Sequence, residues 1–360
     1  MRIIQLITRP QRRGAEIFAI QLSEHLLDLG HEVFIISILK GKGKLHFSGT
    51  LIQLDLPEQG KLDVSGFKRL AEKIKEIKPE IIQANAADTL RYAVGANFFS
   101  KKKYKLIYRN ANQISNFIRN RAQLAFNQFL HSQVDAVISV SDKSKEDYLT
   151  LFSPKHITAI PIGIDSKEIE LKLKESQENF IAEYILFVGS LVPEKDPLGM
   201  LTIFRELQNT NPELKLKFLG SGPLEDGLRE KINSEVLGKS VEVISNQSNI
   251  FPILSKAKAL VMPSKTEGLP GVILESMYCK VPVIAYGVGG IPEILKSGRT
   301  GWCIAPGDAI TFRKAIEEVL NLPEDALERI TTTAEELVLK DYQIDQIAKD
   351  FEGFYCRVIQ

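Results

Sequence analysis

Short apolar runs alternate along the whole chain with longer segments of mixed polarity. The first run, residues 3–7, is followed by a helical pattern over 15–29 that Gly30 closes, and then by a second run at 33–38. Short apolar runs predict buried strands, whereas apolar residues three and four positions apart predict helices. The order strand, helix, strand predicts a parallel βαβ unit.

The same alternation continues to the end of the chain and predicts an α/β fold. Further strands are predicted at 81–82, 106–108, 136–140, 184–188, 216–219, 241–244 and 260–262, and further helices at 66–77, 199–207, 224–232, 253–257 and 344–355. Residues 112–129 form a longer amphipathic stretch. Core packing is its ordinary interpretation, and the alternative is a surface that admits a lipid-linked acceptor or rests on a membrane.

Length and one polar stretch predict the domains. A chain of 360 residues is too long for one ordinary core and suits two domains of about 150 to 180 residues. Residues 166–180 are rich in Glu and Lys and precede a strongly apolar run, so we expect them to be a linker. The predicted domains are therefore 1–165 and 181–340, followed by a C-terminal segment at 341–360.

Composition narrows the class of protein. Hydrophobic residues make up 44% and charged residues 25%, as in soluble globular proteins. Neither an 18-residue apolar run nor a signal-peptide pattern occurs in the sequence, so we expect a cytoplasmic protein. Cys279, Cys303 and Cys356 are widely spaced, and the five histidines lie at no metal-binding spacing. We expect small buried thiols, no disulfide and no metal.

Charge is divided unevenly along the chain. Residues 1–165 hold 24 Lys and Arg against 16 Asp and Glu, a net +8, whereas residues 166–360 hold 22 against 29, a net −7. A basic N-terminal half can attract anionic lipid headgroups or a phosphate-bearing acceptor. The cluster at Lys101, Lys102, Lys103 and Lys105 is by itself more typical of a solvated turn. Nucleic acid is not an expected partner, since no motif for it is present.

The most informative segment is 267–275, which reads Glu-Gly-Leu-Pro-Gly-Val-Ile-Leu-Glu. It follows a predicted strand, and Pro270 suits the first turn of a helix. Glu267 then lies on the loop and Glu275 about one and a half turns into the helix, which places the carboxylates on the order of 10 Å apart. Carboxylates bind sugar hydroxyls and a helix N-terminus favours phosphate. Alternatively, the two acids only complement the helix dipole.

The surrounding residues carry a family resemblance. Segments 263–270, 275–277, 281–284 and 289–293 closely resemble the donor-site signature of retaining nucleotide-sugar glycosyltransferases of the GT-B architecture, glycosyltransferase family 4-like, group 1. Arg13-Gly14-Ala15-Glu16 is similar to the Gly-Gly-Ala-Glu of that family. The resemblance implies two Rossmann-like domains facing a cleft, with the final helix crossing back to the first domain.

The resemblance also implies roles for individual residues. Glu267 would hold the donor sugar, Glu275 would bind the ribose, and Lys195 would stabilise the diphosphate on a loop where α/β folds bind ligands. The remaining donor-side positions are Gly268, Leu269, Pro270, Gly271, Ser190, Gly14 and Gly220. Arg13, Arg109 and Asn110 are implied on the acceptor side. Turn formation is the simpler interpretation of Gly220 and of the pair Arg109-Asn110.

Two departures from the family pattern stand out. Ser190 replaces an arginine that grips the diphosphate, so stabilisation of the leaving group would depend on Lys195, on backbone amides, or on Lys265 or Arg13. The histidine that many relatives carry after the strand equivalent to 106–108 is replaced by Arg109-Asn110. In a front-face mechanism the departing phosphate oxygen takes the acceptor proton, so a separate base is dispensable. Ser245-Asn246-Gln247 lacks the usual glycine of the base site, and the nucleotide base cannot be read.

The sequence therefore predicts a metal-independent retaining glycosyltransferase that needs no cofactor. It would move a hexose-type sugar from a nucleotide-diphosphate sugar to a saccharide or lipid-linked saccharide of the cell envelope, and would touch the inner face of an anionic membrane peripherally. One alternative is a nucleotide-sugar-binding protein that has lost turnover. A nicotinamide-dependent oxidoreductase is less favoured, because neither half contains a full Gly-x-Gly-x-x-Gly pattern with its acidic partner.

Overall fold

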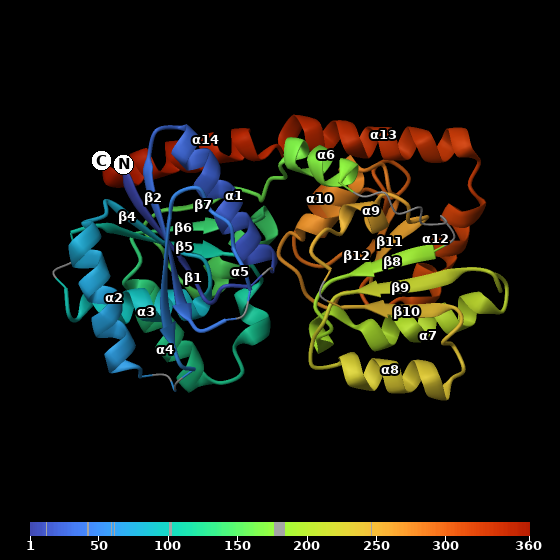
Figure 1. The fold of residues 1–360 in the computed structure, drawn as a ribbon, viewed down its shortest axis with the longest axis horizontal. Coiled ribbons are helices and arrows are strands. Elements are labelled where there is room, and N and C mark those ends of the chain that lie inside the picture. The colour runs from blue at the N-terminus through green and yellow to red at the C-terminus, as the bar shows by residue number, and fades with distance from the viewer. Residues whose placement is uncertain are drawn as a thin grey trace. The chain divides into compact units, whose positions relative to one another are not determined.

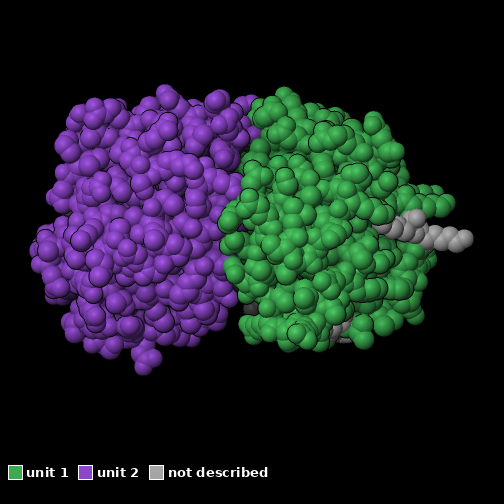
Figure 2. All heavy atoms as spheres, turned by 180° about the vertical axis from the view of Figure 1, so that it is seen from behind, with its two compact units in different colours: residues 1–163, 344–360 green, residues 164–343 purple. Residues whose placement is uncertain are grey.

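The chain forms two compact units (Figures 1 and 2). The computed structural model describes residues 1–11, 13–41, 43–58, 60, 62–100, 103–175, 184–245 and 247–360. Unit 1 consists of residues 1–163 and 344–360, and unit 2 of residues 164–343. Lys101, Lys102, Asn246 and the end of the predicted linker, 176–180, lie outside the described residues.

Unit 1 is built on a seven-stranded parallel sheet with the order β3-β2-β1-β4-β5-β6-β7. The strands are β1 (Arg2–Ile7), β2 (Glu32–Leu39), β3 (Thr50–Leu56), β4 (Ile81–Ala84), β5 (Lys105–Asn110), β6 (Ala136–Ser139) and β7 (Ile157–Ala159). Strand order reverses between β1 and β4, and in open α/β sheets ligands bind where the order reverses, beyond the carboxyl ends of the strands.

Helices cover both faces of this sheet. They are α1 (Gly14–Asp28), α2 (Val64–Ile77), α3 (Ala87–Asn97), α4 (Arg121–Ser132), α5 (Asp142–Leu151) and α14 (Ile344–Ile359), with a 3-10 turn η1 at Ile114–Phe117. Ile4 and Leu6 pack in one core with α2 and α3, whereas Ile7 packs on the opposite face with Ala19 of α1. On the α1 side the C-terminal helix α14 runs beside α1, where the Phe18 and Phe351 ring centroids are 5.8 Å apart (Figure 1).

The amphipathic stretch at 112–129 differs from its predicted core role. It is split into η1 and α4, because the Asn120 side chain caps α4 by accepting the N–H of Gln123 at 2.8 Å. Phe117 and Phe129 remain 43% and 47% exposed. Only Leu130 and His131 of α4 are buried. Ile114 and Ile118 are partly buried and pack against the core of unit 1, so the predicted core role holds for these two residues and fails for Phe117 and Phe129.

Unit 2 contains a six-stranded parallel sheet with the order β10-β9-β8-β11-β12-β13. Its strands are β8 (Tyr184–Val188), β9 (Lys215–Leu219), β10 (Val241–Ile244), β11 (Ala259–Met262), β12 (Val283–Tyr286) and β13 (Trp302–Ile304). Strand order reverses between β8 and β11. The two parallel sheets with interleaved helices confirm the predicted α/β class.

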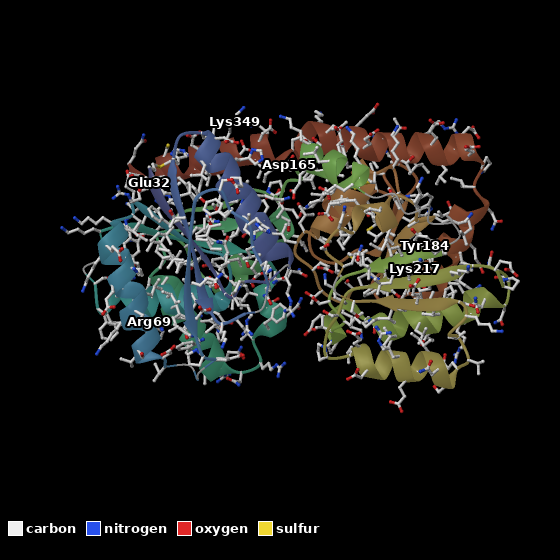
Figure 3. All side chains as sticks on the ribbon, viewed as in Figure 1. Glu32, Arg69, Asp165, Tyr184, Lys217 and Lys349 are labelled. Atoms are coloured by element: carbon white, nitrogen blue, oxygen red, sulfur yellow. The ribbon has the colours of Figure 1, made fainter. Side chains whose placement is uncertain are left out.

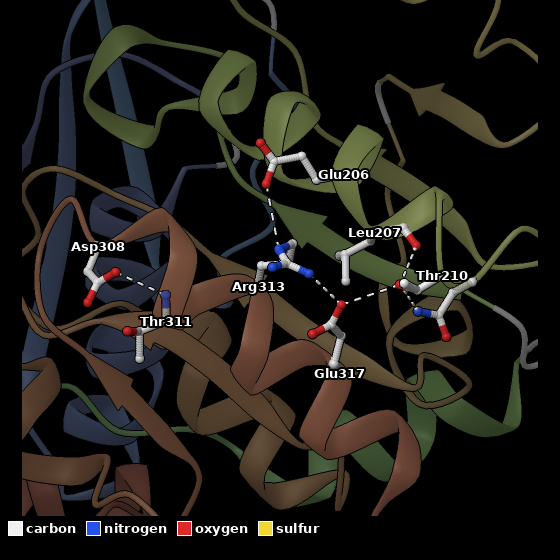
Figure 4. A network of polar contacts seen from close by, with 8 residues as sticks. Glu206, Leu207, Thr210, Asp308, Thr311, Arg313 and Glu317 are labelled. Atoms are coloured by element: carbon white, nitrogen blue, oxygen red, sulfur yellow. Dashed lines mark hydrogen bonds and ion pairs between the residues drawn. The ribbon is translucent and has the colours of Figure 1, made fainter.

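The helices of unit 2 are α6 (Ser166–Lys174), α7 (Pro197–Gln208), α8 (Glu225–Ser234), α9 (Phe251–Leu254), α10 (Gly271–Tyr278), α11 (Ile291–Ile294), α12 (Ala309–Asn321) and α13 (Glu324–Asp341), with a 3-10 turn η2 at Pro193–Lys195. Arg313 of α12 contacts Glu206 of α7 at 3.6 Å and Glu317 at 2.6 Å (Figure 4). On the sheet, the Lys217 ammonium lies 4.7 Å from the Tyr184 ring centroid (Figure 3).

The predicted linker is corrected over most of its length. Residues 166–174 form α6 within unit 2, where the Asp165 side chain caps the helix by accepting the Glu168 N–H at 3.0 Å. Ile169 is buried although its neighbours are charged. One buried apolar residue and an N-cap therefore suffice to form a helix here, although the charged composition of the segment predicted a linker.

Candidate functional site

The loops after β8 and β11 form the site at the carboxyl edge of the unit 2 sheet. The two strands are neighbours, with Leu186 opposite Leu260 in the register. Their carboxyl ends therefore lie together at the point where strand order reverses, which is where doubly wound sheets bind ligands. Residues 189–196 follow β8, and residues 263–270 follow β11 and lead into α10.

Lys195 and Glu267, the two residues predicted to be catalytic, meet across these loops. Lys195 Nζ donates to Glu267 Oε1 at 2.5 Å. The side chains are 23% and 8% exposed, so the carboxylate is nearly buried while the lysine reaches solvent. A buried carboxylate needs a charged or hydrogen-bonding partner, and Lys195 supplies it in the free protein. Sugar hydroxyls can take the same place, since they donate to carboxylate oxygens.

Glycines allow the loop backbones to approach one another closely. A Cβ on Gly220 would lie 1.9 Å from the carbonyl oxygen of Gly189, and Gly220 has φ +152°. Only glycine fits that backbone and that contact. Packing therefore accounts for Gly220, which had been placed on the donor side. Its donor role stays a prediction.

A second close approach braces the Glu267 loop. A Cβ on Gly289 would lie 2.0 Å from the carbonyl oxygen of Glu267, and the Gly290 N–H donates to Gly268 O at 2.6 Å. Gly289 and Gly290 belong to segment 289–293 of the donor-site signature, but no individual role was predicted for either. The signal for them was the pair of adjacent glycines in the loop after β12, which ends at Tyr286, since adjacent glycines mark turns and permit close backbone contact.

Helix α10 begins one residue later than predicted. Pro270 has φ −78° and ψ 124° and is the N-cap, so Gly271 is the first helical residue. Gly268, Leu269 and Pro270 are buried, whereas Gly271 and Ser190 are partly exposed. The first N–H groups of a helix have no partner within the helix, and those of α10 begin at Gly271, four residues after Glu267.

Glu275 lies on α10 in an environment that disfavours its charge. The pKa of this carboxyl is raised from 4.5 to about 7, mainly by burial; Lys172 of α6 lowers it and Glu168 of α6 raises it by smaller amounts. Two side chains of the corrected linker segment therefore act on a predicted donor residue with opposite sign, in addition to the larger effect of burial. A carboxyl that titrates near neutrality exchanges a proton readily with small changes around it.

In unit 1, Gly14 opens α1 as predicted, and Arg13 is its N-cap. No atom lies within 4 Å of a Cβ built on Gly14, so the space next to this helix start is open. Two residues later, Glu16 is buried and accepts a hydrogen bond from Gln11 at 2.9 Å. Burial raises the Glu16 pKa, against the opposing effects of Gln11 and Arg13. The sequence analysis quoted Glu16 as part of the motif without giving it a role.

Arg109 and Asn110 lie inside unit 1. The Arg109 guanidinium is 4.2 Å from the Phe18 ring centroid, and burial lowers its pKa to about 10. Asn110 Nδ2 donates to Ser144 O at 3.0 Å and Ser139 Oγ at 3.3 Å. Both side chains are enclosed by packing, yet Arg109 Nε and Nη1 and Asn110 Oδ1 are buried without a hydrogen-bond partner among the described residues. Their acceptor-side role, like that of Arg13, stays a prediction.

Three further properties concern the part of the chain that the structure describes. Its helices include none that is both long and apolar enough to cross a bilayer. Its His, Cys, Asp and Glu side chains form no group of three or more suited to a metal ion. Cys279 and Cys303 are partly buried free thiols, whereas Cys356 is exposed, contrary to the expectation of three buried residues.

Comparisons with known proteins match one glycosyltransferase family model to each half of the chain. Residues 169–337 match the family model of glycosyl transferases group 1, and residues 12–168 match that of glycosyltransferase family 4. An uncharacterized glycosyltransferase of Haemophilus influenzae is 24% identical over 94% of this chain and 95% of its own. The GalNAc-α-(1→4)-GalNAc-α-(1→3)-diNAcBac-PP-undecaprenol α-1,4-N-acetyl-D-galactosaminyltransferase of Campylobacter jejuni is 26% identical over 98% of this chain and 97% of its own.

Solved structures agree on the fold. Sucrose-phosphate synthase from Thermosynechococcus elongatus has a TM-score of 0.83 at 18% identity, covering 99% of this chain and 98% of its own. HepE from Anabaena, solved with UDP and glucose, has a TM-score of 0.82 at 18% identity, covering 98% of both chains. The two family models together with this fold identify the chain as a group 1 glycosyltransferase of the GT-B architecture.

Proposed function

We propose that this glycosyltransferase moves a hexose-type sugar from a nucleotide-diphosphate sugar to an acceptor hydroxyl, with retention of configuration and without a metal. The contact between Lys195 and Glu267 carries the proposal, because a cation and a nearly buried carboxylate lie 2.5 Å apart at the sheet edge where α/β folds bind ligands. HepE, which has the same fold, was solved with UDP-glucose.

Each donor group has a matching group in unit 2. Glu267 accepts hydrogen bonds from the sugar hydroxyls, and Glu275 in its ionised form accepts them from the ribose. The backbone N–H groups of Gly268 and Leu269 lie next to Glu267 in the chain and can donate to the sugar. Lys195 pairs with the diphosphate, whose charge grows as the bond to the sugar breaks.

The chemical step proposed is a front-face displacement. The bond between the sugar C1 and the phosphate oxygen breaks, and its electron pair stays on that oxygen. The acceptor oxygen forms a bond to C1 from the same face, and its proton moves to the departing phosphate oxygen. The phosphate thus acts as the base, and the enzyme's contribution is to orient both substrates and stabilise the leaving charge.

Metal independence rests on the cations of the loops. Lys195 belongs to the loop after β8 and Lys265 to the loop after β11, so two ammonium groups, each now paired with a carboxylate, could contact the diphosphate in place of a divalent ion. Transfer should be unchanged when EDTA replaces Mg²⁺ or Mn²⁺. Loss of more than about tenfold in EDTA, restored by either ion, would contradict this part of the proposal.

The acceptor proposed is a saccharide or lipid-linked saccharide of envelope polysaccharide synthesis, reached from the cytoplasm. The Campylobacter relative is named for an undecaprenol-diphosphate-linked saccharide, and a Salmonella relative, 29% identical over 44% of this chain, is named for colanic acid biosynthesis. The net charge of +8 in residues 1–165 favours an anionic membrane as a peripheral partner.

Exposed apolar side chains in a basic segment support that membrane contact. Phe117 and Phe129 are partly exposed, and Arg119 and Arg121 between them are exposed. Phe117→Ser with Phe129→Ser should reduce sedimentation with anionic phosphatidylglycerol vesicles but not with neutral ones. Val236→Ser, which removes an 86% exposed apolar residue from unit 2, is the control. Equal effects of both changes would refute a specific membrane face.

The transfer proposal is tested with a panel of nucleotide sugars and an acceptor pool of oligosaccharides and polyprenyl-diphosphate-linked saccharides. Product formation with an α-linked donor should give an α-linked product by NMR, and a β-linked product would exclude retention. Because Ser190 removes a cation from the family pattern, the alternative is a nucleotide-sugar-binding protein without turnover. Tight donor binding with no product from any acceptor would favour that alternative.

A further inference from the structure

Two ion pairs join the loops at the donor site of unit 2, and each loop provides the cation of one pair and the carboxylate of the other. Lys195 of the first loop contacts Glu267 of the second at 2.5 Å, and Lys265 of the second contacts Asp196 of the first at 3.1 Å. Between them, the Lys265 N–H donates to Glu194 O at 2.8 Å. Each loop therefore contributes one cation and one carboxylate, and the four side-chain charges sum to zero.

A neutral set of charges attracts a diphosphate weakly. Lys195 is balanced by Glu267, and Ser190 offers a hydroxyl without charge. For the site to bind an anion that carries two or more negative charges, at least one lysine must exchange its carboxylate for phosphate. Which lysine can do so depends on what its carboxylate partner would then contact.

Asp196 can release its lysine without being left unpaired. Its Oδ1 also accepts the Gly199 N–H at 3.3 Å as the N-cap of α7. Asp196 is 26% exposed, so water can replace the ammonium, and the Lys265 side chain is 63% exposed and can turn toward a ligand. Glu267 is nearly buried, and for its carboxylate the replacement partner must come from the bound sugar.

We propose that Lys265 is the second diphosphate-binding cation of this enzyme and that it leaves Asp196 for phosphate when the nucleotide sugar binds. Lys265 would thereby supply, from the neighbouring strand's loop, the charge that Ser190 lacks. The inference rests on the proposed function, since it requires a diphosphate in this site. In this proposal Asp196 competes with the diphosphate for the Lys265 ammonium and is not itself a ligand-binding residue.

The first test compares Lys265→Gln with Lys258→Gln. Lys258 is exposed and precedes β11, so it lies at the amino edge of the same strand, whereas Lys265 follows the carboxyl edge. Calorimetric titration would use UDP, GDP, ADP, CDP and dTDP, each with its free nucleoside. Lys265→Gln should weaken the best nucleoside diphosphate about tenfold, as expected for a charged hydrogen bond, and leave nucleoside binding unchanged. Lys258→Gln should change neither.

The second test uses Asp196→Asn, which removes the competing charge. Asp196 has φ +51°, and asparagine tolerates this left-handed backbone and caps helices as well as aspartate does. Thermal unfolding should therefore be unchanged. If Lys265 exchanges partners, nucleoside diphosphate binding should tighten several-fold. If the Lys265–Asp196 pair only stabilises the loop conformation, nucleoside diphosphate binding should weaken.

The outcomes separate this inference from the proposed function. A Lys265→Gln affinity equal to wild type, or weaker binding by Asp196→Asn, would overturn the role of Lys265 while nucleotide binding itself stands. Lys265→Arg should keep at least half of the wild-type affinity, and a loss equal to that of Lys265→Gln would also contradict the charge role. If wild-type protein binds none of the five diphosphates, the proposed donor site and the inference fail together.

Discussion

Glu275 should make the stability of unit 2 depend on pH, and Glu275→Gln should abolish that dependence. Burial of this carboxyl raises its pKa from 4.5 to about 7 in the folded protein. Between these two values the folded state holds a proton that the unfolded state releases. Stability therefore falls as pH rises from 4.5 to about 7, and the cost of the buried charge is fully present above pH 7.

The magnitude follows from the two pKa values. At 1.36 kcal/mol per pKa unit, a rise from 4.5 to about 7 corresponds to about 3 kcal/mol. Glutamine keeps the shape of the side chain without its titration. The unfolding free energy of Glu275→Gln, relative to wild type, should therefore increase by about 3 kcal/mol between pH 4.5 and pH 8. Groups that titrate equally in both proteins cancel from this difference.

Urea unfolding followed by tryptophan fluorescence measures the effect where it arises. Trp302, the single tryptophan of the sequence, is buried on β13 of unit 2 and reports that unit. Glu324→Gln on α13 serves as the control for loss of one exposed negative charge. A difference between wild type and Glu275→Gln that stays constant from pH 4.5 to pH 8 would refute the reasoning.

The remaining predictions concern one lysine and two glycines. Lys195→Ala should lower transfer by about 10²- to 10³-fold with a smaller loss of donor affinity, because the leaving charge is greatest in the transition state; equal losses in kcat/KM and in affinity would contradict this. Gly220→Ala should destabilise unit 2 by more than about 2 kcal/mol in the Trp302 urea assay, because its Cβ would lie 1.9 Å from a carbonyl oxygen. A Cβ on Gly14 would enter open space, so Gly14→Ala should change the free energy of unfolding, measured by thermal denaturation, by no more than about 1 kcal/mol. A large destabilisation would show that Gly14 is required for packing.

The parallel sheets and the meeting of Lys195 with Glu267 could be predicted from sequence. The reason is physical: strands of one parallel sheet end at the same edge, so motifs that directly follow two neighbouring strands lie near each other. The Glu267 signature and the Lys195 loop each followed an apolar run. Their contact at 2.5 Å shows that these loops are neighbours, and their shared role in one site stays a prediction.

Features that depend on tertiary environment were beyond the pattern of the sequence. Helix α6 resembled a linker because its only buried residue is Ile169, and one apolar position does not produce a recognisable helical pattern. Phe117 and Phe129 have the spacing of a core helix, yet they remain exposed, since burial depends on which elements pack against that face. Strand β3 was missed because its exposed polar residues break up the apolar run at the sheet edge.

Polar contacts with partners distant in sequence were equally hidden. No local pattern showed that Asp196 pairs with Lys265, that burial shifts the Glu275 pKa, or that Arg109 stacks on Phe18. Each depends on two segments whose distance is set only by the folded unit. Sequence identified the residue types that chemistry needs, and the structure determined which of them share a contact.

The central claim is tested most directly by measuring the release of nucleoside diphosphate from a panel of nucleotide sugars. The assay contains EDTA and the mixed pool of saccharide and lipid-linked acceptors. We predict that one nucleotide sugar is consumed in step with a new glycosidic product of the donor's own anomeric configuration, and that Lys195→Ala reduces this rate at least about 100-fold. An unchanged rate in Lys195→Ala, or a product of opposite configuration, would contradict the account.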